Sequence, residues 1–489
     1  MRVSRGFIAC LLIDTFHAVI GNPVRLINQA RLPLQDTSSP FLTKYHSNAE
    51  LVHHLTQISQ HCGGIAQQIV WGKSNNNLDL VALELYGGQE SVDCRPGFKF
   101  VGNVHGDEPS GRQLLLALAD YLCSAYVAKD DRIVKMLNNI SIVIIPTMNP
   151  DGFDQKLREN SKKVDLNRNF PDPIKNKLLK SLREHTGMEQ PETLAMMNFT
   201  LSRRFIGSLA LHEGALVANY PFDGYADGHT EIRGTKHASP DDATFMHLAK
   251  TYATLHENMA SPSNREFPTG ITNGAQWYPV YGGMQDWNYF AANCMELTLE
   301  LNEKKWPDVP RLAQMWQENL KAFVQYPQTV VLGGVHGHIF SSGDAGERNA
   351  LAASIHIQSQ GMEISSCPSG QYYRPLAPGL YNMTVESSGH IASTVEIRVP
   401  EDGLGLVLNI ELKPHDQPTA SMEQQIFNGS PTINLDSPVN LSHTALVVGK
   451  GSISPLQVML YVLGIPLLGG LSLYLWRQSQ DRKEKASEL

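Results

Sequence analysis

The chain has 489 residues, of which 42% are hydrophobic and 18% are charged, and its formal net charge is −8. This composition is typical of a folded globular protein, and the length suffices for two or three domains. Because the charge balance is acidic and no long run of Lys or Arg precedes the C-terminal tail, the sequence gives no indication of a nucleic-acid partner.

The N-terminus resembles a secretory signal. Residues 1–5 are basic and residues 7–13 are apolar, so we expect residues 1–21 to be a signal peptide. Asp14 and His17 interrupt the apolar stretch, which leaves a disordered leader as the alternative. A signal peptide would place the body of the protein in the secretory or endosomal lumen or outside the cell.

Residues 40–328 alternate between apolar runs of strand length and helical segments. This alternation predicts an α/β domain with a mixed, mostly parallel sheet flanked by helices. The β-branched run at 140–145 is typical of a buried parallel strand. The expected strands are 65–70, 78–85, 98–104, 140–145, 205–211 and 294–301, and the expected helices are 45–62, 192–203, 243–258 and 311–323.

The helical periodicity disappears after residue 328. Short alternating strands with turn residues between them predict a small all-β sandwich over residues 329–414. Residues 415–454 are rich in Pro, Ser, Thr and Asn, and we expect them to form a stalk. The expected strands of the sandwich are 329–338, 351–358, 381–387 and 392–399.

Residues 456–476 form an apolar segment of 21 residues without a charge, which is long enough to span a bilayer as a helix. Trp476 at its end is typical of a membrane interface, and the basic residues that follow predict a cytosolic tail over 477–489. A buried core helix is the alternative, but the polar stalk and the charged terminus disfavour it. We therefore expect a single-pass type I membrane protein. A GPI signal is disfavoured because charged residues follow the apolar segment.

Six cysteines are present, and Cys10 falls inside the expected signal peptide. The remaining number is odd, so in an oxidising compartment at least one thiol would be unpaired or in an intermolecular bridge. Candidate N-glycosylation sites are the sequons at Asn139, Asn198, Asn382, Asn428 and Asn440.

Two potential metal ligands follow the strand expected at 98–104. His105 and Glu108 lie on one turn, before Pro109 opens a helix, and His212 ends a second buried strand. The carboxyl ends of parallel strands meet at one edge of an open α/β sheet, where ligands bind. A catalytic zinc needs about three protein ligands, so these residues predict a zinc site. Each of them alone is more often an ordinary core or loop residue.

A catalytic base is needed beside such a metal, and the strand expected at 294–301 offers two. Along a strand, successive side chains point to opposite faces, so Glu296 and Glu300 share one face. Either glutamate could instead be a solvated strand residue. The alternation alone does not choose between them.

Six longer stretches occur in the order VGNVHGDEPSGRQLLL, NPDGF, VDLNRNFPD, LHEGALVANYPFDG, SPDDATFMHLAKTYA and GITNGAQWYPVYGGMQDWNYFAANCMELTLEL. They resemble the zinc metallocarboxypeptidases, and within them the regulatory branch that includes carboxypeptidases D, E, M and N. The resemblance covers about residues 45–410 and includes a transthyretin-like sandwich at GVHGHIF and PLAPGLYNMTV. It implies the zinc carboxypeptidase fold and one Zn²⁺ ion, and the chain looks like a single-domain, membrane-anchored carboxypeptidase D-like protein.

The resemblance implies the roles of the metal ligands and the base. His105, Glu108 and His212 match the zinc ligands, and Glu300 rather than Glu296 matches the general base. Zinc would lower the pKa of its water towards about 7. Glu300 would take that proton and pass it to the leaving amine.

Four further residues match positions of the family that handle the substrate. Asn167 and Arg168 match the pair that grips the terminal carboxylate of the substrate, and Tyr278 matches the mobile tyrosine that closes over it. Arg158 falls where the family keeps the arginine that polarises the scissile carbonyl. A cation aimed at a free C-terminus makes the enzyme an exopeptidase, because internal peptide bonds lack that charge.

Asp223 matches the position where this branch places an acid in the pocket for the last side chain, and Gln285 matches its polar companion. An acid there implies removal of C-terminal Lys or Arg from peptides or proproteins. Asp223 could instead be a turn former before Gly224, and Asp286 is a rival acid by its proximity to Gln285. The chain departs from the family pattern at Glu213, where relatives commonly have Gly.

An alternative hypothesis is that the chain is not an enzyme. It would then be a catalytically silent, membrane-anchored binding protein that uses the carboxypeptidase scaffold. Some members of the family have lost zinc ligands or the base. This chain retains all four positions, which favours the enzyme.

Overall fold

The computed structural model describes residues 39–343 and 346–415. The expected signal peptide, membrane span and cytosolic tail lie outside these ranges, as does the expected stalk apart from its first residue. Within the described ranges, no helix combines the length and apolar character that crossing a membrane requires.

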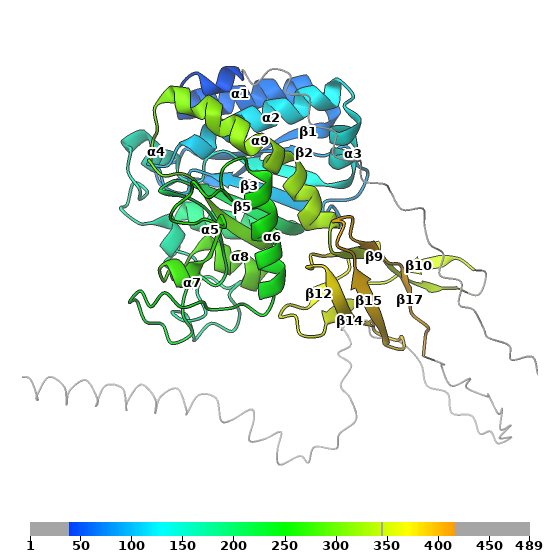
Figure 1. Ribbon diagram of the computed structural model, residues 1–489. Coiled ribbons are helices and arrows are strands. Elements are labelled where there is room, and N and C mark those ends of the chain that lie inside the picture. The colour runs from blue at the N-terminus through cyan, green and yellow to red at the C-terminus, as the bar shows by residue number, and fades with distance from the viewer. Residues whose placement is uncertain (1–38, 344–345, 416–489) are drawn as a thin grey trace, which may run out of the picture. The chain divides into compact units, whose positions relative to one another are not determined.

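An eight-stranded mixed sheet lies at the centre of the first part of the chain (Figure 1). Its strands are β1 (Ala66–Lys73), β2 (Asp79–Leu85), β3 (Gly97–Gly102), β4 (Ser141–Ile145), β5 (Phe205–His212), β6 (Ala215–Tyr220), β7 (Ile271–Asn273) and β8 (Met295–Asn302). They are ordered β1-β2-β4-β3-β5-β8-β6-β7. The central strands β4, β3, β5 and β8 run parallel, and β2 and β6 pair antiparallel with β4 and β8. Every residue of β3, β4 and β5 is buried, as a parallel sheet with both faces covered requires.

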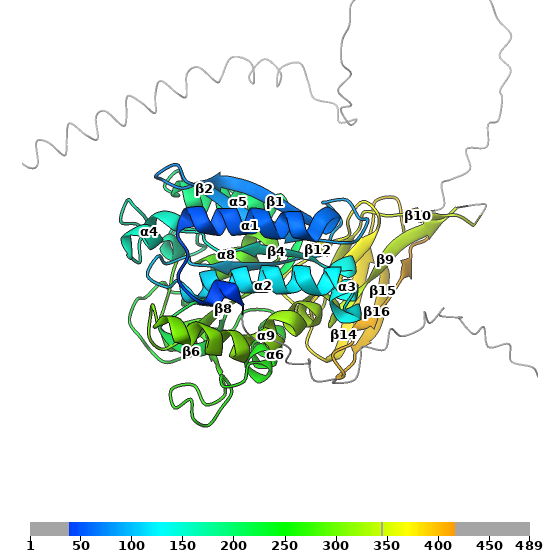
Figure 2. The same ribbon diagram turned by 90° about the horizontal axis from the view of Figure 1, so that it is seen from above.

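Helices cover both faces of this sheet. The helices are α1 (Asn48–Cys62), α2 (Ser110–Val127), α3 (Asp131–Asn139), α4 (Pro150–Gln155), α5 (Pro191–Leu201), α6 (Asp242–Leu255), α7 (Gly274–Trp277), α8 (Met284–Ala292) and α9 (Val309–Leu332). Helices α1, α2, α6 and α9 share an apolar core with one face, and α5 and α8 share a second core with the other. Figure 2 shows α1, α2 and α9 lying side by side across the first face.

The buried strands expected at 140–145, 205–211 and 294–301 are confirmed as β4, β5 and β8. Strand β6 was not expected, because the sequence after His212 indicates a sharp turn away from the sheet. The chain does turn there, but it returns at once and pairs antiparallel with β8.

Helix α9 is longer than the sequence predicts. It continues past residue 323 to Leu332 and contains Pro327 in its interior. The expectation of a strand from residue 329 is therefore wrong, since β9 begins only at Val335, and the boundary expected at 328 falls inside the helix. Proline removes one helical hydrogen bond, but the buried valines beyond it pack into the apolar core and favour continuation.

The residues after α9 form two further sheets that share a core of their own. The strands are β9 (Val335–Ser342), β10 (Arg348–Ala350), β11 (Ser354–Ile357), β12 (Ile364–Ser365), β13 (Gln371–Arg374), β14 (Gly379–Glu386), β15 (Ser393–Val399), β16 (Leu406–Val407) and β17 (Ile410–Glu411). One sheet is built around β9 and has five strands, and the other has the order β12-β11-β14-β15. Ile339 of the first sheet and Met383 of the second lie in the same apolar core. This is the all-β region that the sequence predicts.

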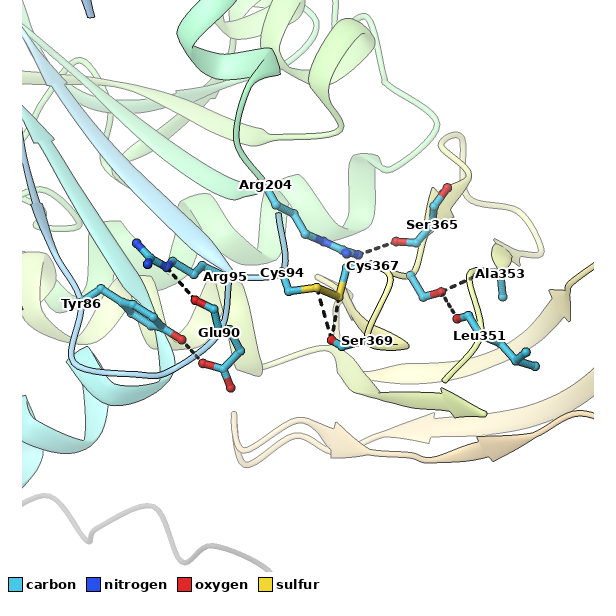
Figure 3. The surroundings of a disulfide bond; sticks show 11 residues. Tyr86, Glu90, Cys94, Arg95, Arg204, Leu351, Ala353, Ser365, Cys367 and Ser369 are labelled. Atoms are coloured by element: carbon cyan, nitrogen blue, oxygen red, sulfur yellow. Dashed lines mark hydrogen bonds between the residues drawn. A yellow bond between two sulfur atoms is a disulfide. The ribbon is translucent and has the colours of Figure 1, made fainter. Parts of the chain in front are cut away.

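Two disulfides form within the described residues. Cys62 pairs with Cys123, and Cys94 pairs with Cys367. The second bond ties the segment before β3 to the all-β region (Figure 3). Cys294 is the buried free thiol of the described part, in line with the odd number of cysteines that remains when Cys10 is set aside.

A buried ion pair also joins the two parts and generates a prediction. Arg374 Nη2 lies 2.6 Å from Asp241 Oδ1, and the side chains are 2% and 0% exposed. We predict that Arg374→Leu lowers the free energy of unfolding in urea by about 3–5 kcal/mol, because Asp241 would keep its buried charge without a cation. The exposed pair of Lys304 and Asp308 provides the control. Lys304→Leu should change the free energy of unfolding by less than about 1 kcal/mol. Equal effects of the two substitutions would contradict the prediction.

Candidate active site

The loop between β3 and α2 presents the first two candidate metal ligands. Strand β3 ends at Gly102 and α2 begins at Ser110. Asn103 has a left-handed φ of 53° and donates from Nδ2 to the carbonyl of His105 at 2.7 Å, which holds the loop in a tight turn. His105 and Glu108 are both buried.

Strand pairing brings His212 and Glu300 to the same edge of the sheet. Strand β5 lies between β3 and β8, and all three run parallel, so their carboxyl ends share one edge. His212 at the end of β5 is paired in register with Glu300 of β8. Strand order and register together therefore bring these two residues to the loop that carries His105 and Glu108.

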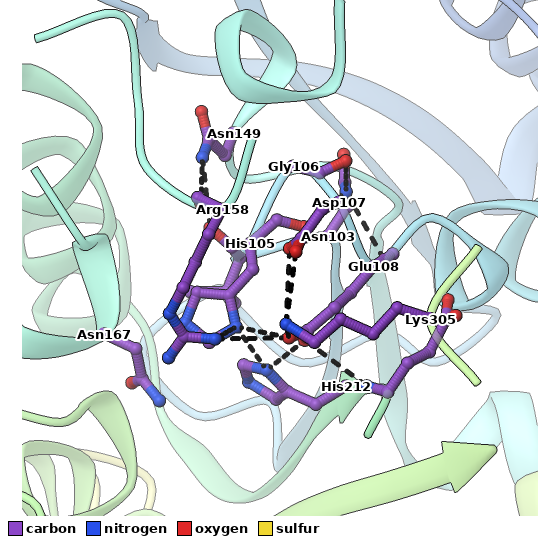
Figure 4. Close-up of polar contacts among 12 residues, drawn as sticks. Asn103, His105, Gly106, Asp107, Glu108, Asn149, Arg158, Asn167, His212 and Lys305 are labelled. Atoms are coloured by element: carbon purple, nitrogen blue, oxygen red, sulfur yellow. Dashed lines mark hydrogen bonds and ion pairs between the residues drawn. The ribbon is translucent and has the colours of Figure 1, made fainter. Parts of the chain in front are cut away.

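The three candidate ligands close on one another as the donors of a metal site do (Figure 4). His105 Nδ1 lies 2.9 Å from Glu108 Oε1, His212 Nδ1 lies 2.8 Å from Glu108 Oε2, and the two Nδ1 atoms are 3.1 Å apart. Asp165 Oδ1 lies 3.2 Å from His105 Nε2, so we assign the proton to Nε2, which leaves the Nδ1 lone pair for a metal. Two imidazoles and one carboxylate, all buried, fit a catalytic zinc with an open position.

The two glutamates of β8 share a face but have different surroundings. Glu296 is fully buried, and its Oε2 lies 3.2 Å from Lys99 Nζ and 2.7 Å from Asn288 Nδ2. Glu300 lines the cavity that contains the metal ligands, and its Oε2 makes no hydrogen bond with any described residue. Geometry favours Glu300 as the candidate base, because Glu300 lines the cavity, whereas Glu296 does not and its Oε2 is held by Lys99 and Asn288.

Burial raises the pKa of Glu300 to about 8, and the negative charge of Glu108 acts in the same direction. His105 and Lys305 oppose the shift. A zinc ion beside Glu300 would add positive charge and favour its carboxylate form. A carboxyl group whose pKa lies near neutrality is suited to accept and return a proton.

Arg158 lies against the ligand set (Figure 4). Its Nη1 is 3.1 Å from His105 Nδ1 and 3.3 Å from Glu108 Oε1, and its Nε donates to Asp165 Oδ2 at 3.0 Å. Asp165 therefore orients both the arginine and a metal ligand. The sequence reasoning did not single out Asp165, although it stands in VDLNRNFPD, two residues before Asn167.

A cavity of about 180 Å³ opens onto these groups and is also lined by Asn167, Arg168 and Tyr278. Arg168 Nη1 donates to the carbonyl of Asn167 at 3.0 Å, and no carboxylate of a described residue forms an ion pair with this arginine. Burial raises the pKa of Tyr278, so its hydroxyl stays protonated at neutral pH. The structure thus places these three of the predicted substrate-binding residues around one cavity.

The same cavity contains the buried carboxylate of Asp223. Asn219 Nδ2 and Gln285 Nε2 donate to its Oδ1 at 3.0 and 2.9 Å, and no described residue donates to Oδ2. Gln285 contacts Asp223 through this hydrogen bond but does not itself line the cavity. Asp286 accepts from the backbone N–H of Asp223 at 3.0 Å and does not line the cavity either. Burial raises the pKa of Asp223 to about 6.

Two further cavity residues lie close to the ligands. Lys305 Nζ is 2.7 Å from Glu108 Oε1, and nothing in its local sequence EKKWPD distinguishes it from a surface lysine. Glu213 follows His212 and stood out only as a departure from the family pattern. It is 2% exposed, and burial raises its pKa to about 7.

Comparison with known proteins decides the family. Residues 51–322 match the M14 peptidases, the zinc carboxypeptidases. The chain belongs to the zinc carboxypeptidase family. It is 39% identical to carboxypeptidase SOL1 of Arabidopsis thaliana, covering 76% of this chain and 73% of the relative. Carboxypeptidase E of Caenorhabditis elegans is 37% identical, with 78% and 89% covered, and carboxypeptidase M of Mus musculus is 38% identical, with 73% and 81% covered.

The family and the geometry therefore agree. The chain is a metallocarboxypeptidase of the M14 family, and the resemblance that the sequence motifs indicate is confirmed. The family implies zinc, and His105, Glu108 and His212 are the described residues whose donor atoms converge to hold it.

We predict that a zinc chelator abolishes peptide hydrolysis by this carboxypeptidase and that added zinc restores it. His212→Ala should lose most of the bound zinc in elemental analysis, because it removes one ligand of about three. The exposed His61 provides the control, and His61→Ala should bind zinc as the wild type does. Full zinc content in His212→Ala would contradict the assignment of the ligands.

Proposed function

We propose that this carboxypeptidase removes C-terminal Arg or Lys from peptides or proproteins. The observation that carries the proposal is the buried carboxylate of Asp223 in the cavity of the metal ligands. Its Oδ2 has no donor among the described residues, so a guanidinium or ammonium group of the substrate is a matching partner. Neutral side chains would leave this buried acceptor without a partner, which is costly.

Arg168 supports the assignment of an exopeptidase. No described carboxylate pairs with its guanidinium, which lies at the same cavity as Asp223. A planar guanidinium binds a carboxylate through two parallel hydrogen bonds. We infer that it binds the free C-terminus, with Asn167 beside it, and that Tyr278 covers the bound residue.

The remaining groups can perform the hydrolysis. Zinc, when bound, supplies a Lewis acid that activates water and polarises the scissile carbonyl. Glu300 accepts the proton of the attacking water and returns it to the nitrogen of the leaving amino acid. Arg158 Nη1 lies beside the ligands, where it can donate to the oxyanion that develops on the carbonyl oxygen.

We further propose that the enzyme is a type I membrane glycoprotein that acts on lumenal or extracellular substrates. The apolar segments in residues 1–21 and 456–476 support this setting. The sequon asparagines within the described residues, Asn139, Asn198 and Asn382, are exposed, as an attached glycan requires.

A catalytically silent binding protein is the competing hypothesis. The ligand set, Glu300 and Arg158 share one cavity, and a scaffold kept only for binding has no need of an unpartnered carboxylate beside a metal site. Catalysis itself separates the two hypotheses.

We predict that Glu300→Gln lowers kcat for a peptide ending in Arg by about 10²–10⁴-fold, because the amide cannot accept the proton of water. Zinc content should be unchanged, since Glu300 is not a ligand. The exposed Glu303 lies in the segment that follows β8, and Glu303→Gln should retain full turnover. Full turnover by Glu300→Gln would rule out this residue as the base.

The pKa of Asp223 gives a second prediction. Because this pKa is raised to about 6, the carboxyl group is charged above that pH and neutral below it. The ratio of kcat/KM for a peptide ending in Arg to that for the same peptide ending in uncharged citrulline should therefore fall as the pH drops through about 6. Groups that act on both substrates change both kcat/KM values by the same factor when they titrate, so their pH dependence does not appear in the ratio.

Asp223→Asn should reduce that ratio by about 10²-fold and remove its pH dependence, since the charge of the pocket is lost. Asp227 is an exposed acid four residues away, and Asp227→Asn should leave the ratio unchanged. A preference for C-terminal Phe in the wild type would refute the proposed basic specificity.

A further inference from the structure

Glu213 is a buried carboxylate of the active-site cavity that the chemistry above does not use. It directly follows His212, the last residue of β5, and only 2% of its surface is exposed. Burying a carboxylate is costly unless donors surround it. Its partners therefore indicate what it does.

Both oxygens of Glu213 accept hydrogen bonds from backbone N–H groups of distant segments. Oε1 accepts from the N–H of Ser110 at 2.5 Å, and Oε2 accepts from the N–H of Trp306 at 2.8 Å. The backbone N–H of Glu213 itself donates to Oε2 of Glu108 at 3.3 Å. One residue thus contacts a metal ligand and two segments next to it.

The bond to Ser110 anchors the helix that follows a metal ligand. Ser110 is the first residue of α2, and Pro109 before it provides no side-chain cap. The first N–H groups of a helix have no partner within the helix, and a carboxylate there is favoured by the helix dipole. Glu213, which directly follows β5, supplies this cap to Ser110, and Ser110 lies two residues after Glu108 in the chain.

The bond to Trp306 anchors the loop that carries Lys305. Trp306 has a left-handed φ of 50°, a conformation that non-glycine residues rarely adopt, so the loop needs a specific contact to hold it. Lys305 is the preceding residue, and its Nζ lies 2.7 Å from Glu108 Oε1. The bond therefore also fixes the approach of this lysine to Glu108.

We propose that Glu213 is a positioning residue of the metal site. Its carboxylate ties the end of β5 to the start of α2 and to the loop at Trp306, so that His212 and Glu108 face each other at a fixed separation before a metal binds. The proposal depends on the zinc site and not on the preference for basic substrates.

The test measures zinc binding directly, by competition with a chromophoric chelator at pH 8. Glu213→Ala should weaken zinc binding by about 10–100-fold, the usual effect of removing a residue that orients a ligand. Glu213→Gln keeps one acceptor oxygen and should show a smaller loss. A second readout is the visible absorption of the cobalt-substituted protein, which reports the ligand geometry and should change in Glu213→Ala.

Glu192 offers a matched control. It is fully buried, lies at the start of α5 and accepts from the backbone N–H of Asn75 at 2.9 Å, but no hydrogen bond or ion pair links it to a metal ligand. Glu192→Ala should destabilise the fold without changing zinc affinity or the cobalt spectrum. The proposal is overturned if zinc affinity in Glu213→Ala and Glu213→Gln stays within about twofold of the wild type, or if Glu192→Ala weakens zinc binding as much as Glu213→Ala does.

Discussion

The site depends on one constraint, the parallel pairing of β3, β5 and β8. Parallel strands end at a common edge, and side chains that follow those ends meet without long connecting loops. The register of β5 against β8 pairs His212 with Glu300. A shift by one residue would turn Glu300 to the opposite face of the sheet. The buried apolar rows that fix this register therefore also fix the separation between His212 and Glu300.

The same strand β8 shows how surroundings give two identical side chains different uses. Glu296 lies four residues before Glu300 on the same face, but Lys99 and Asn288 contact it in the interior of the sheet. A buried charge with such partners contributes to structure, and Glu296 does not line the cavity. Glu300 lies at the carboxyl edge of the sheet and lines the cavity, and its Oε2 has no hydrogen-bond partner among the described residues. The position of each glutamate along β8, and not its residue type, determines whether it is held by buried partners or lines the cavity.

Much of this arrangement was predictable from the sequence, because continuous apolar runs mark the buried strands and the strand-end residues His105 and His212 follow them. The choice between Glu296 and Glu300 was not predictable from alternation, since it depends on partners such as Lys99 that lie far away in the chain. Lys305 and the contacts of Glu213 were hidden for the same reason. The end of α9 was predicted wrongly because the helical periodicity disappears near residue 328, whereas the tertiary packing of the buried valines beyond Pro327 favours the helix.

The disulfide between Cys94 and Cys367 has a consequence for the integrity of the molecule. The bond spans 273 residues, from the segment before β3 to the all-β region. A protease that cuts an exposed loop anywhere between these cysteines would produce two fragments that remain covalently attached. As long as the disulfide is intact, a cleaved enzyme would keep its candidate metal ligands and its all-β region in one molecule. The resistance of the enzyme to proteolysis would therefore depend on redox conditions as well as on the stability of the fold.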